Sequence, residues 1–520
     1  MSITTTFTTN LGCITDFGLH FRPDSPALLQ DGFELTYRQL DERINRVANG
    51  LTAAGVQRGD RVLVLWENDI RFVEATLGTI RAGAVAVPVN PSLPIEAHRL
   101  HLNDSSAVGI LASRGTAANT SRLMSDPTVL IAAALDGAKH GVTDYEQWLA
   151  SSSVVRPEIF NAPEDLTWLA YTSGSTGRPK GVKLAHQMLL GDVAKLGHSC
   201  FIDSNDRSIV AAPMFHMNAA ACGILPALHA GGSVVVLPKF DPAEILRSIE
   251  QRGCTYAVGV PAMYKLMLAE HDELSRDFSS LRMILCGSAP MPSSLIERLT
   301  GVFPNVRFVE GYGMTECGPV ATINPLAGPR RVGSIGRPLP GFEVKIVDEI
   351  GIEIPAGETG ELWLRSEQCI TLGYLNRPEE DAQRKMADGW FATGDLAMCD
   401  EDGWLYFRGR ADDRMSVGGE NVYPAEVEAI LAQHPAVHDV TVVAALHETK
   451  SEVPVAFVVL VKDANVTEDE LKQHSLARGP AYAHPRRIVF LPAMPLSATG
   501  KVDHRNLISM AVQHFGEPIS

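Results

Sequence analysis

The sequence predicts an α/β protein with a large N-terminal domain and a small, mobile α+β domain at its C-terminus. The large domain is expected to hold layered, mostly parallel sheets with helices, and a small distorted β-barrel region. Three observations lead to this prediction. The chain has 520 residues, more than the roughly 250–300 at which one hydrophobic core stops growing. Helical stretches alternate with short, wholly apolar stretches up to residue 340, and beyond it the pattern changes.

The first elements set the alternating pattern. Residues 37–54 carry apolar side chains at helical spacing, and Gly55 follows where such a helix would end. An apolar strand is predicted at Arg61–Leu65, then a helix at Ile70–Arg81 and a strand at Ala84–Val89. Further strands are predicted at Leu166–Ala170, Val234–Leu237, Ala257–Val260, Met283–Leu285 and Val306–Val309. Wholly apolar strands that alternate with helices indicate a parallel sheet covered on both faces.

Beyond residue 340, glycine and aspartate separate short strands, which is typical of antiparallel pairing. These strands are predicted at Phe342–Val347, Gly360–Leu364 and Trp404–Phe407. After Gly409, a polar turn leads into a helix that begins near Pro424. A later helix opens with the capping pattern of Thr467 and Glu470. We therefore expect domains of residues 1–410 and 411–520.

Charge and composition exclude several classes of function. The formal net charge of -16 disfavours nucleic acid or an anionic membrane as a partner, since both favour clustered Lys and Arg. The N-terminus lacks the basic and apolar regions of a signal peptide, and no segment has the run of about 18 apolar residues that a membrane span needs. The expected location is the cytoplasm, without integral membrane association. The eight cysteines are widely spaced and predicted to be reduced packing residues.

The most informative segment is YTSGSTGRPKG at residues 171–181, directly after a predicted strand. Small residues let backbone N–H groups surround phosphate oxygens, and Lys180 adds positive charge. The spacing departs from the usual P-loop, because Pro179 stands where the second glycine should be. On composition alone, a phosphate site and an ordinary surface turn remain equally open.

The full motif YTSGSTGRPKGV resembles the phosphate-binding loop of the adenylate-forming superfamily. This superfamily includes acyl- and aryl-CoA synthetases of the 4-coumarate, 4-chlorobenzoate and fatty acid CoA ligase types, peptide-synthetase adenylation domains and luciferases. Further matches follow in chain order at Pro213–His216, Gly287–Pro290, Gly311–Glu316, Thr393–Asp395, Gly409–Arg410 and Pro495–Lys501. The resemblance implies an ATP-dependent carboxylate–CoA ligase. Such an enzyme forms an acyl-adenylate and pyrophosphate, and then passes the acyl group to CoA with release of AMP.

The matched residues suit the first step, in which a carboxylate attacks the α-phosphorus of ATP and two anions must approach each other. By resemblance, Glu316 holds Mg²⁺, the Thr315 hydroxyl orients a phosphate or the substrate carboxylate, and Lys501 neutralises charge during adenylation. Tyr312 offers a face to adenine. The resemblance assigns these residues to the nucleotide: Thr172, Ser173, Gly174, Ser175, Thr176, Gly177, Lys180, Gly287, Ser288, Ala289, Pro290, Glu310, Gly311, Tyr312, Gly313, Met314, Asp395 and Arg410.

For the second step, the family implies that the small domain rotates about a hinge, here at Asp412, and presents another face for thiol transfer. Residues assigned to CoA are Ser416, Gly418, Gly419, Tyr482, Arg486 and, for the 3′-phosphate, Arg81. Two departures concern this step. Many relatives carry lysine where this chain has Ser416, and the basic run that they often show near residue 484 is here Tyr-Ala-His-Pro-Arg-Arg.

The resemblance also suggests what kind of acid is used. The pocket is expected to include His216, Met217, Asn218, Gly287, Gly311, Gly313, Met314 and Cys317. His216 would gate the pocket or touch the carboxylate. Amino-acid-activating relatives place Asp at this element, so an α-amino acid is disfavoured, and the lack of Arg in the set disfavours a short dicarboxylate. An aryl, arylpropenoate or medium-chain acid is expected.

Other functions stay open on the sequence alone. The acyl acceptor could be a carrier-protein thiol or oxygen in place of CoA. A phosphotransferase would release ADP, and a nucleotide-binding module could have kept the fold without activity. The pathway and the oligomeric state, with a homodimer as one option, are not set by the motifs.

Overall fold

The computed structural model describes residues 9–173, 179–271, 277–287, 291, 293–418, 420–447, 450–496 and 502–515. The chain forms two compact units. Unit 1 comprises Met1–Glu343 with Arg365–Phe391, and unit 2 comprises Val344–Leu364 with Ala392–Ser520. Beyond residue 343, one stretch of the chain therefore belongs to unit 1 and the rest to unit 2. The domain boundary at residue 410 and the hinge at Asp412 remain predictions.

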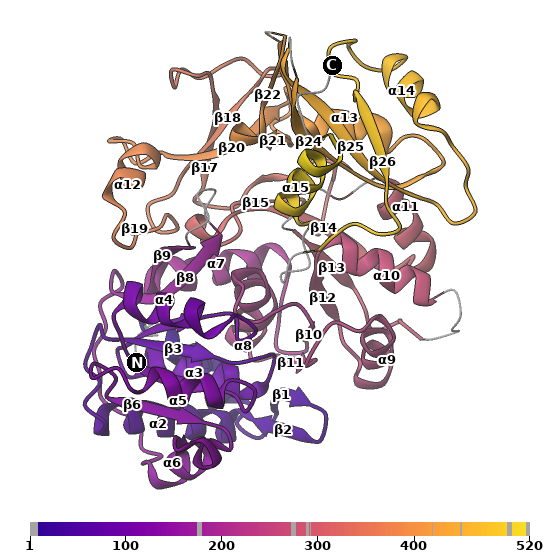
Figure 1. Cartoon of the computed structure of the whole chain (residues 1–520). Helices are drawn as coiled ribbons and strands as arrows, with labels where there is room; N and C mark the ends of the chain where they lie inside the picture. The colour runs from indigo at the N-terminus through magenta and orange to yellow at the C-terminus, as the bar shows by residue number, and fades with distance from the viewer. Residues whose placement is uncertain are drawn as a thin grey trace. The chain divides into compact units, whose positions relative to one another are not determined.

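Unit 1 holds two large sheets (Figure 1). In the first, the strand order is β19-β9-β8-β4-β3-β5-β6-β7. Its strands are β3 (Arg61–Leu65), β4 (Val85–Pro88), β5 (Ala107–Ala112), β6 (Ile131–Ala134), β7 (Thr143–Asp144), β8 (Leu166–Ser173), β9 (Pro179–Ala185) and β19 (Gly373–Tyr374). Strands β4, β3, β5 and β6 pair in parallel, whereas β8, β9 and β19 pair antiparallel to one another.

The second sheet has the order β16-β15-β14-β13-β12-β10-β11-β1-β2. Its strands are β1 (Pro26–Gln30), β2 (Phe33–Thr36), β10 (Arg207–Val210), β11 (Ser233–Val236), β12 (Tyr256–Gly259), β13 (Met283–Cys286), β14 (Arg307–Tyr312), β15 (Thr322–Ile323) and β16 (Arg337–Pro338). Strands β11, β12 and β13 are buried at every position. This explains their unbroken apolar sequences, because helices cover both faces of such a sheet.

The helices of unit 1 alternate with these strands, as predicted. They are α1 (Asp16–Phe21), α2 (Tyr37–Ala53), α3 (Ile70–Arg81), α4 (Ile95–Ser105), α5 (Ala117–Leu123), α6 (Tyr145–Ser151), α7 (His186–Ser199), α8 (Leu225–His229), α9 (Pro242–Arg252), α10 (Pro261–His271), α11 (Ser293–Val302) and α12 (Pro378–Arg384). Leu246, Leu268 and Leu299 from α9, α10 and α11 share one core with Val235 and Ile284 of the second sheet.

Unit 2 begins with a sheet in the order β17-β18-β20-β21, in the region where the sequence predicted short antiparallel strands. Its strands are β17 (Glu343–Val347), β18 (Thr359–Arg365), β20 (Phe391–Cys399) and β21 (Leu405–Arg410). The second sheet of this unit contains β22 (Met415–Val417), β23 (Glu420–Val422), β24 (Val437–His447), β25 (Ser451–Leu460) and β26 (Arg487–Phe490). Its helices are α13 (Pro424–Leu431), α14 (Glu468–Leu476) and α15 (His504–Phe515).

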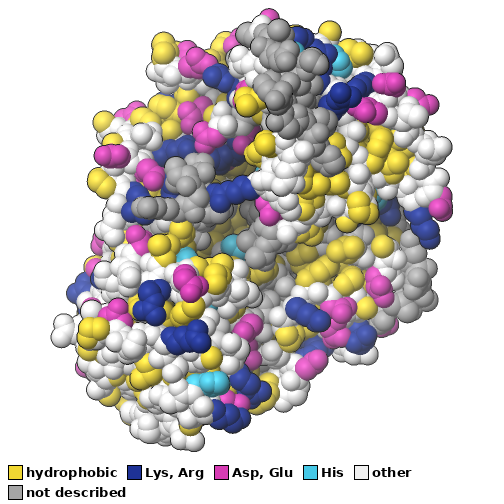
Figure 2. Space-filling model, in the orientation of Figure 1, with side chains coloured by type: hydrophobic (Ala, Val, Ile, Leu, Met, Phe, Trp, Pro, Cys, Tyr) yellow, Lys and Arg dark blue, Asp and Glu magenta, His cyan; other side chains and the backbone are white. Residues whose placement is uncertain are grey.

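The predicted fold class is confirmed, and so are several details. Strands β20 and β21 pair antiparallel, as do β24 and β25. Thr467 and Glu470 form the reciprocal capping bonds expected at the start of α14. Within the described ranges, every helix falls short of the length and apolar character that a membrane span requires. Acidic and basic side chains are interspersed on the face shown in Figure 2.

Candidate active site

Several predicted site residues lie at one edge of the second sheet of unit 1, where its parallel strands end. Strands β13 and β14 are parallel, with Cys286 opposite Glu310. Gly287 and Gly311 therefore adjoin, and a Cβ on Gly287 would lie 3.5 Å from the carbonyl oxygen of Gly311. His216 follows β10, which pairs in parallel with β12 of the same sheet. The carboxyl ends of parallel strands meet at one edge, which is where α/β proteins usually bind ligands.

A tight turn after β14 places Thr315 and Glu316. These residues form a short 3₁₀ helix, η4 (Thr315–Cys317). The backbone N–H of Met314 donates to Cys317 Sγ at 3.2 Å, which closes the turn. A Cβ on Gly313 would lie 1.8 Å from the carbonyl oxygen of Pro319, so this position accepts only glycine. Glu316 is 7% exposed. The turn thus holds a nearly buried carboxylate close to the sheet edge.

The Glu316 carboxylate is bonded to a residue that the sequence did not single out. The phenolic hydroxyl of Tyr374 donates to Glu316 Oε1 at 2.7 Å. Burial and the negative charge of Glu316 raise the pKa of Tyr374 above its usual value. The phenol therefore keeps its proton near neutral pH and acts as a neutral donor to Glu316.

The β8–β9 hairpin carries the predicted phosphate loop. Thr172 and Lys180 lie opposite each other at the end of the hairpin that leads into this loop. The loop residues Gly174, Ser175, Thr176 and Gly177, and the side chain of Ser173, lie outside the described residues. Lys180 forms an ion pair with Glu380 of α12, and its Nζ is 5.9 Å from the centre of the Tyr374 ring. The predicted phosphate-binding lysine and Glu316 thus both contact Tyr374.

Asn68 holds the segment that leads to His216. Its Nδ2 donates to the carbonyl oxygen of Ala212 at 2.9 Å, and its Oδ1 accepts from the backbone N–H of Met214 at 2.8 Å. The chain then continues into a π-helix, η3 (Asn218–Ile224). Such elements are rare and often occur at functional sites. Met217 and Cys317, both predicted pocket residues, are buried.

Glu310, at the end of β14, is a buried acid with an unusual pKa. Its Oε2 lies 3.6 Å from Arg330 Nη2 and accepts from Asn324 Nδ2 at 3.4 Å. Burial is the larger effect and raises the pKa of Glu310 to about 7, although the charge of Arg330 opposes it. Burial also lowers the pKa of Arg330. The charge of this carboxyl group therefore changes near neutral pH.

Unit 2 brings together two further residues predicted to bind nucleotide. Asp395 and Arg410 lie opposite each other on β20 and β21. Arg410 Nη1 is 2.9 Å from Asp395 Oδ1, and its Nη2 is 3.7 Å from Asp412 Oδ2. The N–H of Asp395 donates to Thr393 Oγ1 at 3.0 Å. The predicted ribose-binding carboxylate and the predicted arginine thus form one pair beside the predicted hinge.

The described residues of unit 2 that are predicted to contact CoA lie at or near its surface. Ser416 is exposed on β22, and its N–H donates to Glu452 Oε2 at 2.9 Å. Gly418 is exposed and has a φ of 63°, which favours glycine. Tyr482 is 39% exposed. Arg486 is partly buried beside His484, and burial lowers the pKa of Arg486.

The family of the chain follows from comparison with known proteins. The family model described as AMP-binding enzyme matches residues 19–375, and that of the AMP-binding enzyme C-terminal domain matches residues 426–501. The chain belongs to the AMP-binding enzyme family. This AMP-binding enzyme is 36% identical over 482 residues to a feruloyl-CoA synthase of Amycolatopsis sp, a match that covers 92% of this chain and 94% of the relative.

Two further similarities agree. A 4-coumarate–CoA ligase of Oryza sativa subsp. japonica is 33% identical over 491 residues, with 92% of this chain and 89% of the relative covered. The crystal structure of an anthranilate CoA ligase in complex with anthranoyl-AMP superposes with a TM-score of 0.90 at 29% identity, and the match covers 98% of each chain. The resemblance to the adenylate-forming superfamily is confirmed. The chain is an enzyme of the acid–thiol ligase class.

The structure does not support a CoA contact for Arg81 of this AMP-binding enzyme. Its side chain is 1% exposed. The guanidinium donates to Asp41 Oδ1 and to Asn45 Oδ1, each at 2.6 Å, and to the carbonyl oxygen of Gly12 at 2.9 Å. Arg81 therefore joins α3 to α2 and the N-terminal segment inside unit 1, because a buried guanidinium needs such partners.

Some predicted residues lie outside the described residues. They include Ser288, Ala289, Pro290, Gly419 and Lys501.

Three residues of the site were not predicted from the sequence: Tyr374, Asn68 and Arg330. For Tyr374, the available signal was its place in Leu-Gly-Tyr, four residues before the start of α12 at Pro378. Asn68 and Arg330 have no local signal, since each acts on residues more than ten positions away.

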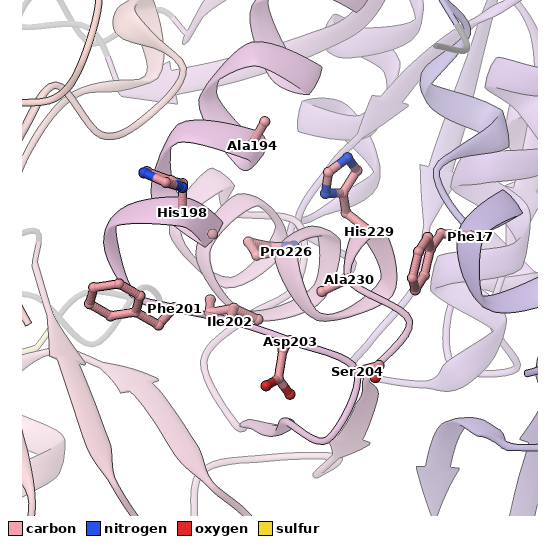
Figure 3. Close-up of a pocket in the computed structure, with 11 residues that line it drawn as sticks. Phe17, Ala194, His198, Phe201, Ile202, Asp203, Ser204, Pro226, His229 and Ala230 are labelled. Atoms are coloured by element: carbon pink, nitrogen blue, oxygen red, sulfur yellow. The ribbon is translucent and has the colours of Figure 1, made fainter. Parts of the chain in front are cut away.

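A surface pocket in unit 1 lies between the end of α7, the end of α8 and α1 (Figure 3). Phe17, His198, Phe201 and His229 contribute to its lining. None of the residues predicted from the sequence lines this pocket. It is therefore distinct from the sheet edge that carries Gly311 and Glu316.

Proposed function

We propose that this AMP-binding enzyme joins an aryl, arylpropenoic or medium-chain acid to CoA in two steps. In the first step, the carboxylate attacks the α-phosphorus of ATP, which forms acyl-AMP and releases pyrophosphate. In the second step, the CoA thiol attacks the acyl carbonyl carbon, which forms acyl-CoA and releases AMP. The named activities of the relatives, on feruloyl, 4-coumarate and anthranilate substrates, support an aromatic acid.

One observation carries the proposal: the phosphate hairpin and the Glu316 turn are bonded to the same short segment. The backbone N–H of Thr371 donates to the carbonyl oxygen of Glu316 at 2.8 Å. The N–H of Leu375 donates to the carbonyl oxygen of Gly181, on β9, at 2.8 Å. A triphosphate held by the hairpin would therefore lie within reach of Thr315 and Glu316. That arrangement suits attack on an α-phosphorus, which requires positioning and charge neutralisation.

Glu316 is the residue that would hold Mg²⁺. Sites for Mg²⁺ at nucleotides usually use one or two carboxylates, with phosphate oxygens and water as the other ligands. Glu316 together with phosphate oxygens would fit this one-carboxylate pattern. Among the described residues, no group of three or more His, Cys, Asp or Glu could hold a metal ion. When bound, Mg²⁺ neutralises phosphate oxygens. Thr315 contributes a hydroxyl donor next to Glu316, and Lys180 contributes positive charge from the hairpin.

The expected acid pocket favours an uncharged acyl tail. Its expected side chains are those of Met217, Met314, Cys317, Asn218 and His216, and its glycines leave room for the acyl group. Met217 and Cys317 are buried, and the set includes no lysine or arginine. An aromatic ring fits such an apolar lining, and Asn218 offers an amide to a polar substituent. His216 would touch the carboxylate or gate the pocket.

Unit 2 would complete both steps. Lys501 would neutralise charge during adenylation, while Asp395 and Arg410 would bind ribose and phosphate. Rotation about Asp412 would then present Ser416, Gly418 and Gly419 to the thiol, and Tyr482 and Arg486 to CoA. A cytoplasmic location belongs to the same proposal, with a homodimer as the candidate assembly.

Product analysis tests the proposal. The full chain is incubated with ATP, Mg²⁺, CoA and one acid from each class: an arylpropenoate, a benzoate, a medium-chain fatty acid and an α-amino acid. We expect AMP, pyrophosphate and an acyl-CoA from an aryl, arylpropenoic or medium-chain acid, and little product from the α-amino acid. Release of ADP, or AMP without any acyl-CoA, would contradict the assignment.

A further inference from the structure

Tyr374 lies between two parts of the proposed site that are far apart in the sequence. Its strand β19 pairs antiparallel with β9 of the phosphate hairpin, with Tyr374 opposite Val182. Its hydroxyl is bonded to Glu316 Oε1, 58 positions earlier in the chain. The residue is 7% exposed. A small displacement of this tyrosine would therefore change where Glu316 lies relative to the hairpin.

The backbone around Tyr374 is fixed from both sides. The N–H of Tyr374 donates to Asp381 Oδ1 at 2.8 Å. Gly373 has a φ of 113°, and a Cβ there would lie 2.3 Å from Asp381 Oδ2, so this position requires glycine. The Thr371 hydroxyl donates to the carbonyl oxygen of Lys183 at 2.8 Å. The phenol thus projects from a well-defined strand towards Glu316.

The Tyr374 hydroxyl also restricts the orientation of the Glu316 carboxylate. A carboxylate on a short turn can rotate about its side-chain bonds, and each rotation moves both oxygens. The Tyr374 bond holds Oε1 and thereby restricts these rotations. Partners that bond metal-ligating carboxylates are important for affinity, because they orient the ligand before the metal arrives.

We propose that Tyr374 is a positioning residue that orients the Glu316 carboxylate for the Mg²⁺–nucleotide complex. This inference rests on the proposed function, in which Glu316 holds the metal. Tyr374 itself need not touch the metal or either substrate. Its loss should weaken metal binding in the nucleotide complex and leave acid recognition largely unchanged, because the turn that carries Met314 and Cys317 is closed by its own bond and not by the Tyr374 hydroxyl.

The test is Tyr374→Phe, which removes one hydroxyl and keeps the ring. Mn²⁺ replaces Mg²⁺, since both accept octahedral oxygen ligands. Binding of Mn²⁺ to the full chain is followed by electron paramagnetic resonance in the presence of α,β-methylene-ATP, whose P–C–P bridge cannot release pyrophosphate and so cannot form acyl-AMP. We expect the Kd of Mn²⁺ to rise about 10- to 100-fold, the usual loss for such partners. The KM for the acid, from pyrophosphate exchange at saturating Mg²⁺, should change by less than about twofold.

Tyr145→Phe is the matched control. It removes a buried phenol that donates to Glu74 Oε1 at 3.1 Å, on helices that carry neither Glu316 nor the phosphate hairpin. Its Kd for Mn²⁺ should stay within about twofold of wild type. In a Glu316→Gln background, Tyr374→Phe should raise the Kd of Mn²⁺ by less than about a further twofold, since both changes remove the same Tyr374–Glu316 interaction.

The outcomes separate this inference from the proposed function. Wild-type protein that binds Mn²⁺ with the nucleotide, together with an unchanged Kd in Tyr374→Phe, would overturn the role of Tyr374 alone. An equal loss in Tyr145→Phe would also overturn it, because general destabilisation would then explain the effect. If the wild type shows no nucleotide-dependent Mn²⁺ binding, the metal role of Glu316 fails and the inference fails with it.

Discussion

The free energy of unfolding of the wild-type protein should fall as the pH rises, because Glu310 becomes ionised. Glu310→Gln should lack this fall. Glu310 is 6% exposed, and burial raises its pKa from 4.5 to about 7. Below pH 4.5 the carboxyl group is protonated in both the folded and the unfolded chain. Between pH 4.5 and 7 the unfolded chain releases the proton while the folded chain keeps it. Rising pH therefore favours unfolding across this window.

The size of the effect follows from the two pKa values. Each unit of pKa corresponds to about 1.4 kcal/mol, so the free energy of unfolding should fall by about 2–3 kcal/mol between pH 5 and pH 8 because of Glu310. Glutamine has a similar shape but does not titrate, so the free energy of unfolding of the variant should lack this fall. For a unit as large as unit 1, the difference is equivalent to about 3 °C in Tm.

The assay is thermal unfolding of wild type and Glu310→Gln at half-unit steps from pH 5 to pH 8, by circular dichroism. Only the change with pH is interpreted, because exchange of the carboxyl group for an amide in this buried position adds an offset that does not depend on pH. Glu428 offers a comparison in unit 2, since burial raises its pKa to about 7 as well. Glu428→Gln should flatten the pH dependence of the transition of unit 2.

Parallel curves for wild type and Glu310→Gln over the whole range would refute this reasoning. They would mean that Glu310 is already ionised in the folded protein at pH 5. The charge of Arg330, 3.6 Å away, would then outweigh the cost of burial.

Two further predictions concern the nucleotide. Lys501→Ala should lower the single-turnover rate of acyl-adenylate formation by about 10²–10³-fold in a folded protein, because a charge at the reacting phosphate is lost; a near-normal rate would reject its role. Glu380→Gln should lower the KM for ATP about two- to fivefold, since Lys180 no longer has to leave a carboxylate to meet phosphate. The exposed neighbour Glu379, changed to glutamine, is the control, and an equal or higher KM in Glu380→Gln would count against the prediction.

Much of the fold could be predicted because the signals are local. The helix at Ile70–Arg81 occurs as predicted, and the strand predicted at Val234–Leu237 occurs at Ser233–Val236. Wholly apolar runs between helices can be buried only in a covered parallel sheet, so their sequence indicates their position. The glycine at 313 could likewise be placed in the site from its motif, although its close approach to Pro319 shows only in three dimensions.

The remaining features depend on contacts between distant segments. Arg81 looked available for a phosphate, but Asp41 and Asn45 on α2 enclose its guanidinium. Tyr374 reaches Glu316 only because its two-residue strand pairs with β9, and no local pattern indicates that pairing. The charge of Glu310 depends on its burial. Tertiary packing, more than residue type, decides these roles.

The proposed role of the residues at this sheet edge is adenylation of a carboxylic acid. The most direct test is exchange of labelled pyrophosphate into ATP by the full chain, with Mg²⁺ and an arylpropenoic acid but without CoA. Exchange that requires the acid, and that falls sharply in Glu316→Gln, is the expected result. Label that enters ATP without any acid, or no exchange with any aryl, arylpropenoic or medium-chain acid, would contradict the claim.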